Sequence, residues 1–173
     1  MAGTRASDMP DLEQLIRRHE RLVLGTAYRL LGNLEDAQDA AQEVLVRLLK
    51  YRRRFDEDRE LAPWLYRITV NVCHDLRRRR RELPLADAGD PAAAEPAPFG
   101  ALEIEQRQRL LRRGLKVLSE KERAAVVLRD IEGLPTAEVA RILQSTEATV
   151  RSQVSMARLK LRDFCDRALK RRV

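Results

Sequence analysis

The sequence has few aromatic residues, few cysteines and no long apolar run. Aromatic side chains make up 4% of the 173 residues, which disfavours a fold built on β-sheets because strands draw on aromatic and β-branched residues. The two cysteines, Cys73 and Cys165, form no CxxC pair, so neither a disulfide framework nor a cysteine metal site is expected. The N-terminus has no apolar signal core, and no segment approaches the ~20 apolar residues of a membrane helix. These absences predict a cytoplasmic protein with no membrane insertion.

Charged residues are abundant, and they are unevenly distributed. They form 35% of the chain, with a net charge of +7, which makes a polyanion the first candidate partner. Residues 1–81 carry 17 basic and 13 acidic groups, and residues 101–173 carry 17 basic and 10 acidic groups. The segment between them, residues 82–100, carries no basic group and four acidic groups. Four of the seven prolines lie in residues 82–100. The sequence therefore predicts an all-α protein with two small helical domains, residues 1–81 and 101–173, joined by an acidic Pro/Ala-rich linker, residues 82–100.

Apolar periodicity predicts a bundle of three to four helices in residues 1–81. The first helix is expected from Asp8 or Asp11 to Leu31, and Gly32-Asn33 ends it. Asn33 can then cap a second helix from Leu34 to about Tyr51. A third begins near Pro63 and runs through the five arginines at 77–81, and residues 52–60 form a loop.

The C-terminal domain shows the pattern of a helix-turn-helix. A helix from Leu102 to about Leu118 is followed by a capping box at Ser119–Glu122, and the helix that it opens ends at Gly133. Two short helices then flank Gln144-Ser145-Thr146. Their expected buried residues are Val139, Ala140, Leu143, Val150, Val154, Ala157 and Leu161. An amphipathic hairpin with no DNA role would show the same pattern, and the basic charge of this domain favours DNA.

A second candidate nucleic-acid surface lies in the first domain. Four of the seven aromatic residues fall within 51–66, interleaved with arginines. Aromatic side chains that stack on bases, beside arginines that hold phosphates, are typical of single-strand binding. Trp64 and Tyr66 could equally belong to the core. The arginines at 77–81 could simply complement the negative end of a helix.

Four stretches of the chain form a recognisable set: TAYRLLGNLEDAQDAAQEVL (26–45), PWLYRITVNVCHDLRRRRR (63–81), VLRDIEGLPTAEVARIL (127–143) and EATVRSQVSMARLKLR (147–162). Together they resemble the extracytoplasmic-function (ECF) group of bacterial sigma factors, which belong to the sigma-70 family. Their order and spacing agree with the family over nearly the whole chain. The resemblance implies an alternative transcription initiation factor that binds core RNA polymerase, recognises −10 and −35 promoter elements and assists promoter melting.

The resemblance also implies a polymerase-binding surface on the second helix. Its residues are Asp36, Asp39, Gln42 and Glu43, which in the family dock on a coiled coil of the largest subunit; the polymerase flap is a further contact. From the residues alone, Asp36, Asp39 and Glu43 could hold a divalent metal. No histidine, nucleophile or phosphate loop accompanies them, so no metal, cofactor or catalytic role is expected.

The DNA-binding positions implied by the resemblance fall in both domains. Those for the −10 element and melting are Arg53, Arg54, Phe55, Trp64, Arg67, Asn71, Asp75 and Arg78. Those for the −35 element are Thr149, Arg151, Ser152, Ser155, Met156 and Arg158. Gln153 and Met156 stand where the family usually has arginine, which leaves the −35 preference open.

The expected partners are therefore core RNA polymerase and promoter DNA, both double-stranded and melted. An anti-sigma protein is a further candidate, since members of the group are often held by one. In a holoenzyme the protein would be associated with the nucleoid. Two rival functions remain: a stand-alone helix-turn-helix regulator that acts without polymerase, and a metal-dependent nuclease.

Overall fold

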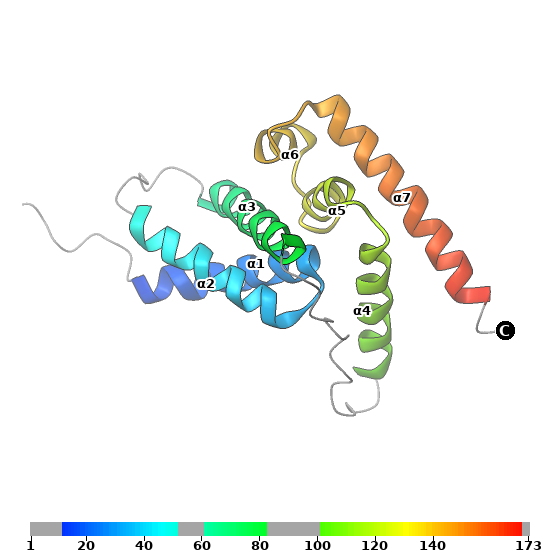
Figure 1. The fold of residues 1–173 in the computed structure, drawn as a ribbon, viewed down its shortest axis with the longest axis horizontal. Coiled ribbons are helices and arrows are strands. Elements are labelled where there is room, and N and C mark those ends of the chain that lie inside the picture. The colour runs from blue at the N-terminus through cyan, green and yellow to red at the C-terminus, as the bar shows by residue number, and fades with distance from the viewer. Residues whose placement is uncertain (1–11, 52–60, 83–100, 171–173) are drawn as a thin grey trace, which may run out of the picture.

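The computed structural model describes residues 12–51, 61–82 and 101–170, and every element within them is a helix. In chain order they are α1 (Leu12–Leu31), α2 (Leu34–Tyr51), α3 (Leu61–Glu82), α4 (Ala101–Lys116), α5 (Glu120–Val126), the π-helical turn η2 (Val127–Ile131), α6 (Thr136–Ile142) and α7 (Glu147–Lys170). Figure 1 shows α1–α3, the N-terminal bundle, beside α4–α7, the C-terminal half. The predicted all-α fold is confirmed. The predicted loop at 52–60 and all of the predicted linker except Glu82 lie outside the described residues.

The N-terminal bundle buries one apolar face of each helix. Val23 of α1, Val44 of α2 and Leu65 of α3 are completely buried, and the three helices contact one another in pairs. Asn33 caps α2 as predicted, because its side-chain oxygen accepts the backbone N–H of Asp36 at 2.8 Å. Pro63 lies in the first turn of α3, where a missing N–H breaks no helical hydrogen bond.

In the C-terminal half, α5 and α4 pack against α7. The predicted capping box is present: the Glu122 N–H donates to the Ser119 hydroxyl at 3.3 Å, and the Ser119 N–H donates to the Glu122 carboxylate at 2.9 Å. A Cβ atom on Gly114 of α4 would lie 3.0 Å from the side chain of Leu161, so glycine allows close approach of the two helices.

The helix that the capping box opens does not continue as an α-helix to Gly133. Its last turn is η2, in which the Glu132 N–H donates to the carbonyl of Val127 at 2.9 Å. Gly133 then adopts a φ of +76°, a left-handed conformation that ends the helix. Helical periodicity alone does not reveal this wider turn, which sets the direction of Glu132.

The turn between α6 and α7 is closed by a residue in an unfavourable conformation. Gln144 has a φ of +50°, its N–H donates to Arg141 and the N–H of Ser145 donates to Ala140. This pairing is a Schellman motif, in which glycine usually occupies the left-handed position.

Replacing Gln144 by glycine is therefore expected to stabilise the C-terminal half. A left-handed conformation costs a non-glycine residue about 1–2 kcal/mol, and part of that gain is lost to the greater freedom of glycine in the unfolded chain. We expect a net gain of about 0.5–1 kcal/mol in the free energy of unfolding, measured by urea titration. Gln144→Ala serves as control, because it removes the same side chain while keeping the Cβ atom. An equal gain for alanine would contradict this explanation.

The helix-turn-helix is otherwise as the sequence predicts. Val139, Ala140, Val150, Val154 and Ala157 are buried, and Leu143 and Leu161 are partly buried against the same core. The Thr146 hydroxyl accepts the backbone N–H of Thr149 at 3.1 Å and so caps α7. The second helix extends beyond the predicted Arg162 to Lys170, and this helix packs along α4.

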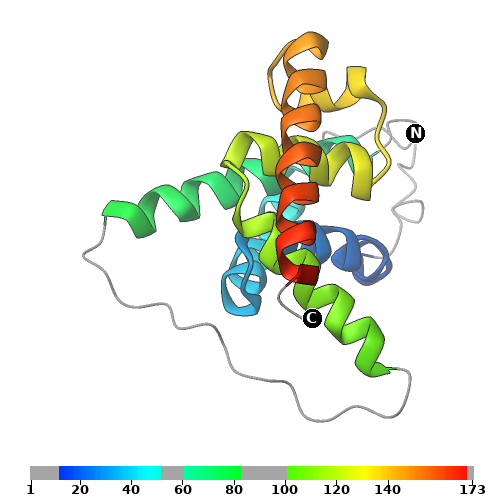
Figure 2. The ribbon, with the colours of Figure 1, turned by 90° about the vertical axis from the view of Figure 1, so that its right-hand side faces the viewer.

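The two halves of the chain lie against each other, which the sequence does not predict. The α3 helix contacts α6, and α1 contacts α4, α5 and η2. Figures 1 and 2 both show α7 on the outside of this assembly, on the side away from the N-terminal bundle. The contacts between the halves therefore leave the second helix of the helix-turn-helix open to a partner.

Candidate nucleic-acid interface

Three of the four predicted polymerase-binding residues share the exposed face of α2. Asp39, Gln42 and Glu43 are exposed, and Glu43 accepts a hydrogen bond from Arg47 one turn later at 2.8 Å. This ion pair is itself exposed and contributes little to stability. The face is therefore polar and acidic, and its side chains are available to a basic partner.

Asp36 does not share that face. Its residue exposure is 6%, its carboxylate accepts a hydrogen bond from the Asn33 side chain at 2.5 Å and it forms an ion pair with Arg80 of α3. Asp36 is therefore buried and paired within the molecule, and it does not lie with Asp39, Gln42 and Glu43 on the surface open to a partner. A three-residue spacing brings it near Asp39 along the helix, but its interactions with Asn33 and Arg80 turn it toward the start of α2 and the end of α3. Within the described parts of the chain, no group of three His, Cys, Asp or Glu side chains is arranged to hold a metal ion.

The outward face of α3 gathers the predicted −10 residues that the structure describes. Trp64, Arg67, Asn71, Asp75 and Arg78 follow the i, i+3, i+7, i+11, i+14 positions of one helical face. Arg67, Asn71 and Arg78 are exposed, and Arg78 lies 3.4 Å from Asp75. These side chains form a row of about 21 Å at 1.5 Å per residue. Arg53, Arg54 and Phe55 lie outside the described residues.

Trp64 begins this row and is partly buried. It packs against the hydrophobic core, and its ring meets that of Tyr51 edge to face at a centroid distance of 6.3 Å. Such a pair fixes the orientation of both rings. Trp64 therefore contacts the core and also lies at the end of the outward row. Its interpretation as a core residue is compatible with its interpretation as a base-contacting residue.

Glu132, which follows η2 in the C-terminal half, makes a polar contact with α1 and α3 of the N-terminal bundle. Its carboxylate accepts hydrogen bonds from Thr26 at 3.1 Å, from Arg29 at 2.9 Å and from Tyr66 at 3.0 Å. Burial, and then the Glu132 carboxylate, raises the pKa of Tyr66. Thr26 and Tyr66 are both buried, so Glu132 satisfies hydroxyl groups that would otherwise lie unpaired in the interface.

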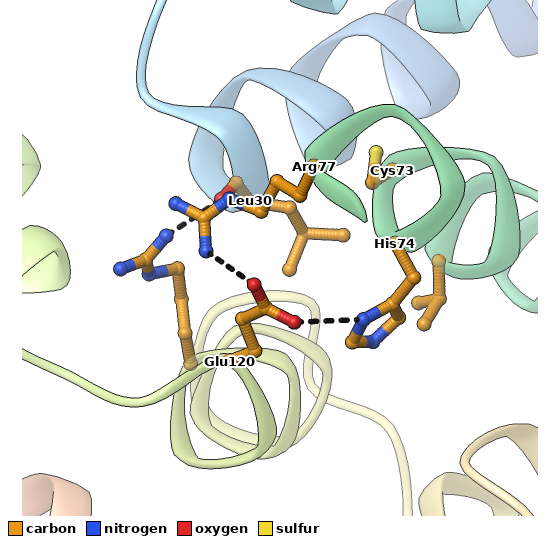
Figure 3. Close-up of a pocket in the computed structure, with 7 residues that line it drawn as sticks. Leu30, Cys73, His74, Arg77 and Glu120 are labelled. Atoms are coloured by element: carbon orange, nitrogen blue, oxygen red, sulfur yellow. Dashed lines mark hydrogen bonds and ion pairs between the residues drawn. The ribbon is translucent and has the colours of Figure 1, made fainter. Parts of the chain in front are cut away.

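Glu120 makes a second polar contact between the halves. It lies 3.2 Å from the His74 ring, 3.7 Å from Arg77 and 2.5 Å from Arg81. Figure 3 shows Glu120 facing His74 and Arg77 across the gap between α5 and α3. Arg77 and Arg81, which from the sequence could simply complement the negative end of a helix, are therefore engaged within the molecule. Cys73, beside them, is buried, and burial raises the pKa of its thiol to about 12, which makes it an inert core residue.

Replacing Glu132 by alanine is expected to separate the two halves without unfolding either one. The change leaves the Thr26 and Tyr66 hydroxyls unpaired, at roughly 1–3 kcal/mol for each buried group that finds no water. In small-angle X-ray scattering we expect a larger radius of gyration for the variant at moderate salt, with an unchanged helical circular dichroism signal. Glu132→Gln keeps hydrogen-bond acceptance and should give an intermediate value, and Asp163→Ala, on the exposed part of α7, should leave the radius unchanged. An unchanged radius for Glu132→Ala would show that Glu132 does not hold the halves together.

The six predicted −35 residues on α7 are all exposed. The two arginines of this set, Arg151 and Arg158, differ in how strongly they are paired within the molecule. Arg158 donates two hydrogen bonds of 2.8 Å to Asp130, and these bonds, with those of Arg129, lower the pKa of Asp130. Arg151 has a longer pairing with Glu147, 3.2 Å between exposed partners. Arg158 is therefore engaged with η2, and Arg151 is much less constrained. Thr149, Ser152, Ser155 and Met156 make up the rest of the set.

Several functional contacts were not predicted from the sequence. Glu120, Arg123, Glu132 and the Asp130–Arg158 pair all depend on residues that meet only in the folded chain. The one available signal is the segment VLRDIEGL, residues 127–134. It contains Asp130 and Glu132 without indicating their partners, and it does not include Glu120, Arg123 or Arg158. The described helices include none long and apolar enough to cross a membrane.

Comparison with known proteins gives a family match in each half of the chain. Residues 15–82 match sigma-70 region 2, and residues 108–161 match sigma-70 region 4. The chain is 34% identical to the ECF RNA polymerase sigma factor SigM of Mycobacterium tuberculosis, covering 93% of this chain and 80% of that one. It is 35% identical to the ECF RNA polymerase sigma factor SigE of Mycolicibacterium smegmatis over 90% of this chain, and it spans 62% of the length of that relative.

Two solved structures share the fold. The sigma factor RpoE of Bartonella quintana, in complex with the anti-sigma factor NepR, superposes with a TM-score of 0.74 at 25% identity, covering 91% of this chain and 98% of that one. CnrH, in complex with the cytosolic domain of CnrY, gives a TM-score of 0.64 at 28% identity, covering 90% and 87%. The α1–α3 bundle thus corresponds to region 2 and the helix-turn-helix to region 4. The chain belongs to the ECF group of the sigma-70 family of RNA polymerase sigma factors.

Proposed function

We propose that this protein is an alternative sigma factor that binds core RNA polymerase and directs it to promoters with −10 and −35 elements. The observation that carries the proposal is the presence of three exposed faces on three helices of one chain: an acidic face on α2, the arginine–asparagine row on α3 and the outward face of α7. A stand-alone regulator would use the third face and leave the first two without a role. The nuclease is not favoured, because Asp36 is paired with Asn33 and Arg80, and no three His, Cys, Asp or Glu side chains of the described residues are arranged to hold a metal ion.

The acidic face of α2 is the proposed contact with the polymerase. Asp39, Gln42 and Glu43 project from it and would meet a coiled coil of the largest subunit, with the flap as a second contact for region 4. Asp36 has a supporting role, since its bonds to Asn33 and Arg80 hold the start of α2 against the end of α3. It would position the docking face without touching the polymerase.

The row on α3 is the proposed contact with the −10 element. Arg67 and Arg78 would hold phosphates, Asn71 would reach base edges, and Trp64 at the end of the row would stack on an unpaired base. Melting then draws on the binding free energy of unstacked bases, so the protein acts as a factor rather than as an enzyme and needs no cofactor. Arg53, Arg54 and Phe55, which lie outside the described residues, are proposed to contact the −10 element as well.

Recognition of both elements requires the halves to separate. By their positions, the −10 and −35 elements lie about 25 base pairs apart, roughly 85 Å of duplex at 3.4 Å per pair, whereas α3 and α6 are in direct contact. The contacts of Glu120 and Glu132 would therefore break when the polymerase binds. The residues 82–100 would act as the linker that permits this, between domains at 1–81 and 101–173.

An anti-sigma protein is a further proposed partner. It is supported by a solved relative, the sigma factor RpoE of Bartonella quintana, which is in complex with the anti-sigma factor NepR. The site of action would be the cytoplasm, with association to the nucleoid in the holoenzyme.

Replacing Arg151 by alanine is expected to weaken recognition of the upstream element. The side chain is exposed on the outward face of α7 and is held by Glu147 alone among the contacts described for it. Loss of one cation–base contact costs about 1–3 kcal/mol, or roughly 5- to 150-fold in affinity. The measurement is DNase footprinting of the holoenzyme on promoter DNA. Arg167→Ala, on the exposed end of the same helix, is the control, and an unchanged upstream footprint for Arg151→Ala would remove Arg151 from the reading surface.

The proposal as a whole is tested by separating polymerase binding from DNA binding. The purified chain is mixed with core polymerase and with fork-junction DNA, and each complex is isolated by size-exclusion chromatography. We expect a stable complex with core polymerase, and retention of the fork DNA by that complex. Binding of duplex DNA without any association with core polymerase would instead support the stand-alone regulator.

A further inference from the structure

Between residues 148 and 159, the outermost face of α7 carries no charge. Ala148, Ser152, Ser155, Met156 and Leu159 are exposed and lie opposite the buried Val150, Val154 and Ala157. We call these five exposed residues the uncharged strip. Met156 is 45% exposed and Leu159 is 43% exposed, so two large apolar side chains of the strip are open to a partner. Figure 2 looks onto α7, and no described helix lies in front of it.

Two of the cations that border the strip form ion pairs within the molecule. Arg158 is bound by both carboxylate oxygens of Asp130, and Lys160 donates to both oxygens of Glu122 at 2.8 and 2.9 Å. Gln153 is half-buried and lies off the strip. Arg151, with its exposed partner Glu147 at 3.2 Å, is the cation best placed to move toward DNA.

The strip matches a specific chemical feature of the major groove. The small side chains of Ala148, Ser152 and Ser155 allow the helix to approach base edges closely, and the serine hydroxyls can meet donors or acceptors. The 5-methyl group of thymine is the apolar feature that the groove presents, and an exposed methionine supplies a flexible apolar contact for it. An arginine, by contrast, would select guanine.

We propose that Met156 is a specificity-determining residue that reads the 5-methyl group of a thymine in the −35 element. The proposal rests on the proposed function, because it requires α7 to enter the major groove. Met156 lies five residues after Arg151, a rise of about 7.5 Å, which corresponds to roughly two base-pair steps. If Arg151 contacts a guanine, the thymine read by Met156 lies about two steps from it.

The test removes the methyl group from the DNA and the thioether from the protein. The full chain bound to core polymerase first selects its upstream element from a randomised duplex pool. Each thymine of the selected element is then replaced by deoxyuridine, which lacks only the 5-methyl group. At one thymine, wild-type affinity is expected to fall about 3- to 5-fold, the equivalent of one buried methyl group.

The variants assign that loss to Met156. Met156→Ala is expected to bind the thymine duplex 3- to 5-fold more weakly than wild type and to be insensitive to deoxyuridine at that position. Met156→Leu keeps an apolar contact and should keep the sensitivity. Leu159→Ala, the matched control of similar exposure on the strip, should also keep it.

Three results would overturn the proposal, each in a distinguishable way. If deoxyuridine lowers the affinity at no position, or lowers it equally for wild type and Met156→Ala, then Met156 does not read a methyl group. The proposed function would still stand in that case. If Met156→Ala weakens binding to core polymerase and leaves DNA affinity unchanged, the strip is a protein-docking surface. If the complex enriches no upstream element at all, the proposed function fails and the inference fails with it.

Discussion

Replacing Arg123 by methionine is expected to destabilise the protein by about 3–5 kcal/mol. The guanidinium is buried and donates to the carbonyls of Leu115 at 2.7 Å, Leu118 at 3.0 Å and Leu30 at 2.9 Å, with a longer contact of 3.4 Å to Lys116. Leu30 is at the end of α1, so this one side chain satisfies helix-terminal carbonyls from both halves. Burial lowers the pKa of Arg123 to about 10, so it remains protonated at neutral pH.

Methionine preserves much of the volume and none of the donors. The buried carbonyls of Leu30 and Leu118 lose their bond to the guanidinium, and the carbonyl of Leu115 keeps only the Leu118 N–H, at 3.3 Å. A loss of this size is a large share of the roughly 5–15 kcal/mol that stabilises a typical domain. The measurement is chemical denaturation followed by circular dichroism. Lys121→Met, an exposed change on the same helix, should shift the free energy of unfolding by less than about 0.5 kcal/mol. Similar values for the two variants would mean that water replaces Arg123 at no cost.

A double charge reversal on α2, Asp39→Lys with Glu43→Lys, is expected to weaken binding to core polymerase by about 100-fold or more. Both carboxylates are exposed on the proposed docking face. Placing like charges across an interface costs several kcal/mol, and ~3 kcal/mol corresponds to about a factor of 100. The fold should persist, because a cation at position 43, one turn before Arg47, costs the helix only about 0.3–0.5 kcal/mol in repulsion.

The matched control changes the same total charge elsewhere. Glu20→Lys with Asp163→Lys alters two exposed acidic residues on α1 and α7, and it should leave core binding within a few-fold of wild type. Affinity is measured by fluorescence anisotropy of the labelled chain. If both double variants weaken binding equally, net charge rather than the α2 face governs the interaction.

Local structure could be predicted from the sequence where a local rule determines it. The Asn33 cap, the Ser119–Glu122 capping box and the buried stripe of α7 depend on residues within a few positions of each other, and they are confirmed. The exposed residues of α3 follow equally from helical spacing. The role of each residue at the interfaces with polymerase and DNA stays a prediction.

The contacts between the halves could not be predicted in this way. The Thr26–Glu132 hydrogen bond joins residues 106 positions apart, and no periodicity couples them. The burial of Asp36 has a similar cause, because its partner Arg80 comes from another helix. Gln144 stands where the turn of a helix-turn-helix usually has glycine, and this much is visible in the sequence. Its left-handed φ of +50° is imposed by the packing of α6 on α7, because glutamine does not favour that conformation alone.

We propose above that this chain gives promoter specificity to core RNA polymerase. The most direct measurement is run-off transcription by core polymerase, with and without the purified chain, on a template that carries the selected upstream element and a downstream −10 element. We expect transcripts of one defined start site that require the chain, and their loss with the Asp39→Lys, Glu43→Lys variant. The core polymerase must be active under the conditions used. If the amount of this transcript is then equal with and without the chain, the chain does not give promoter specificity.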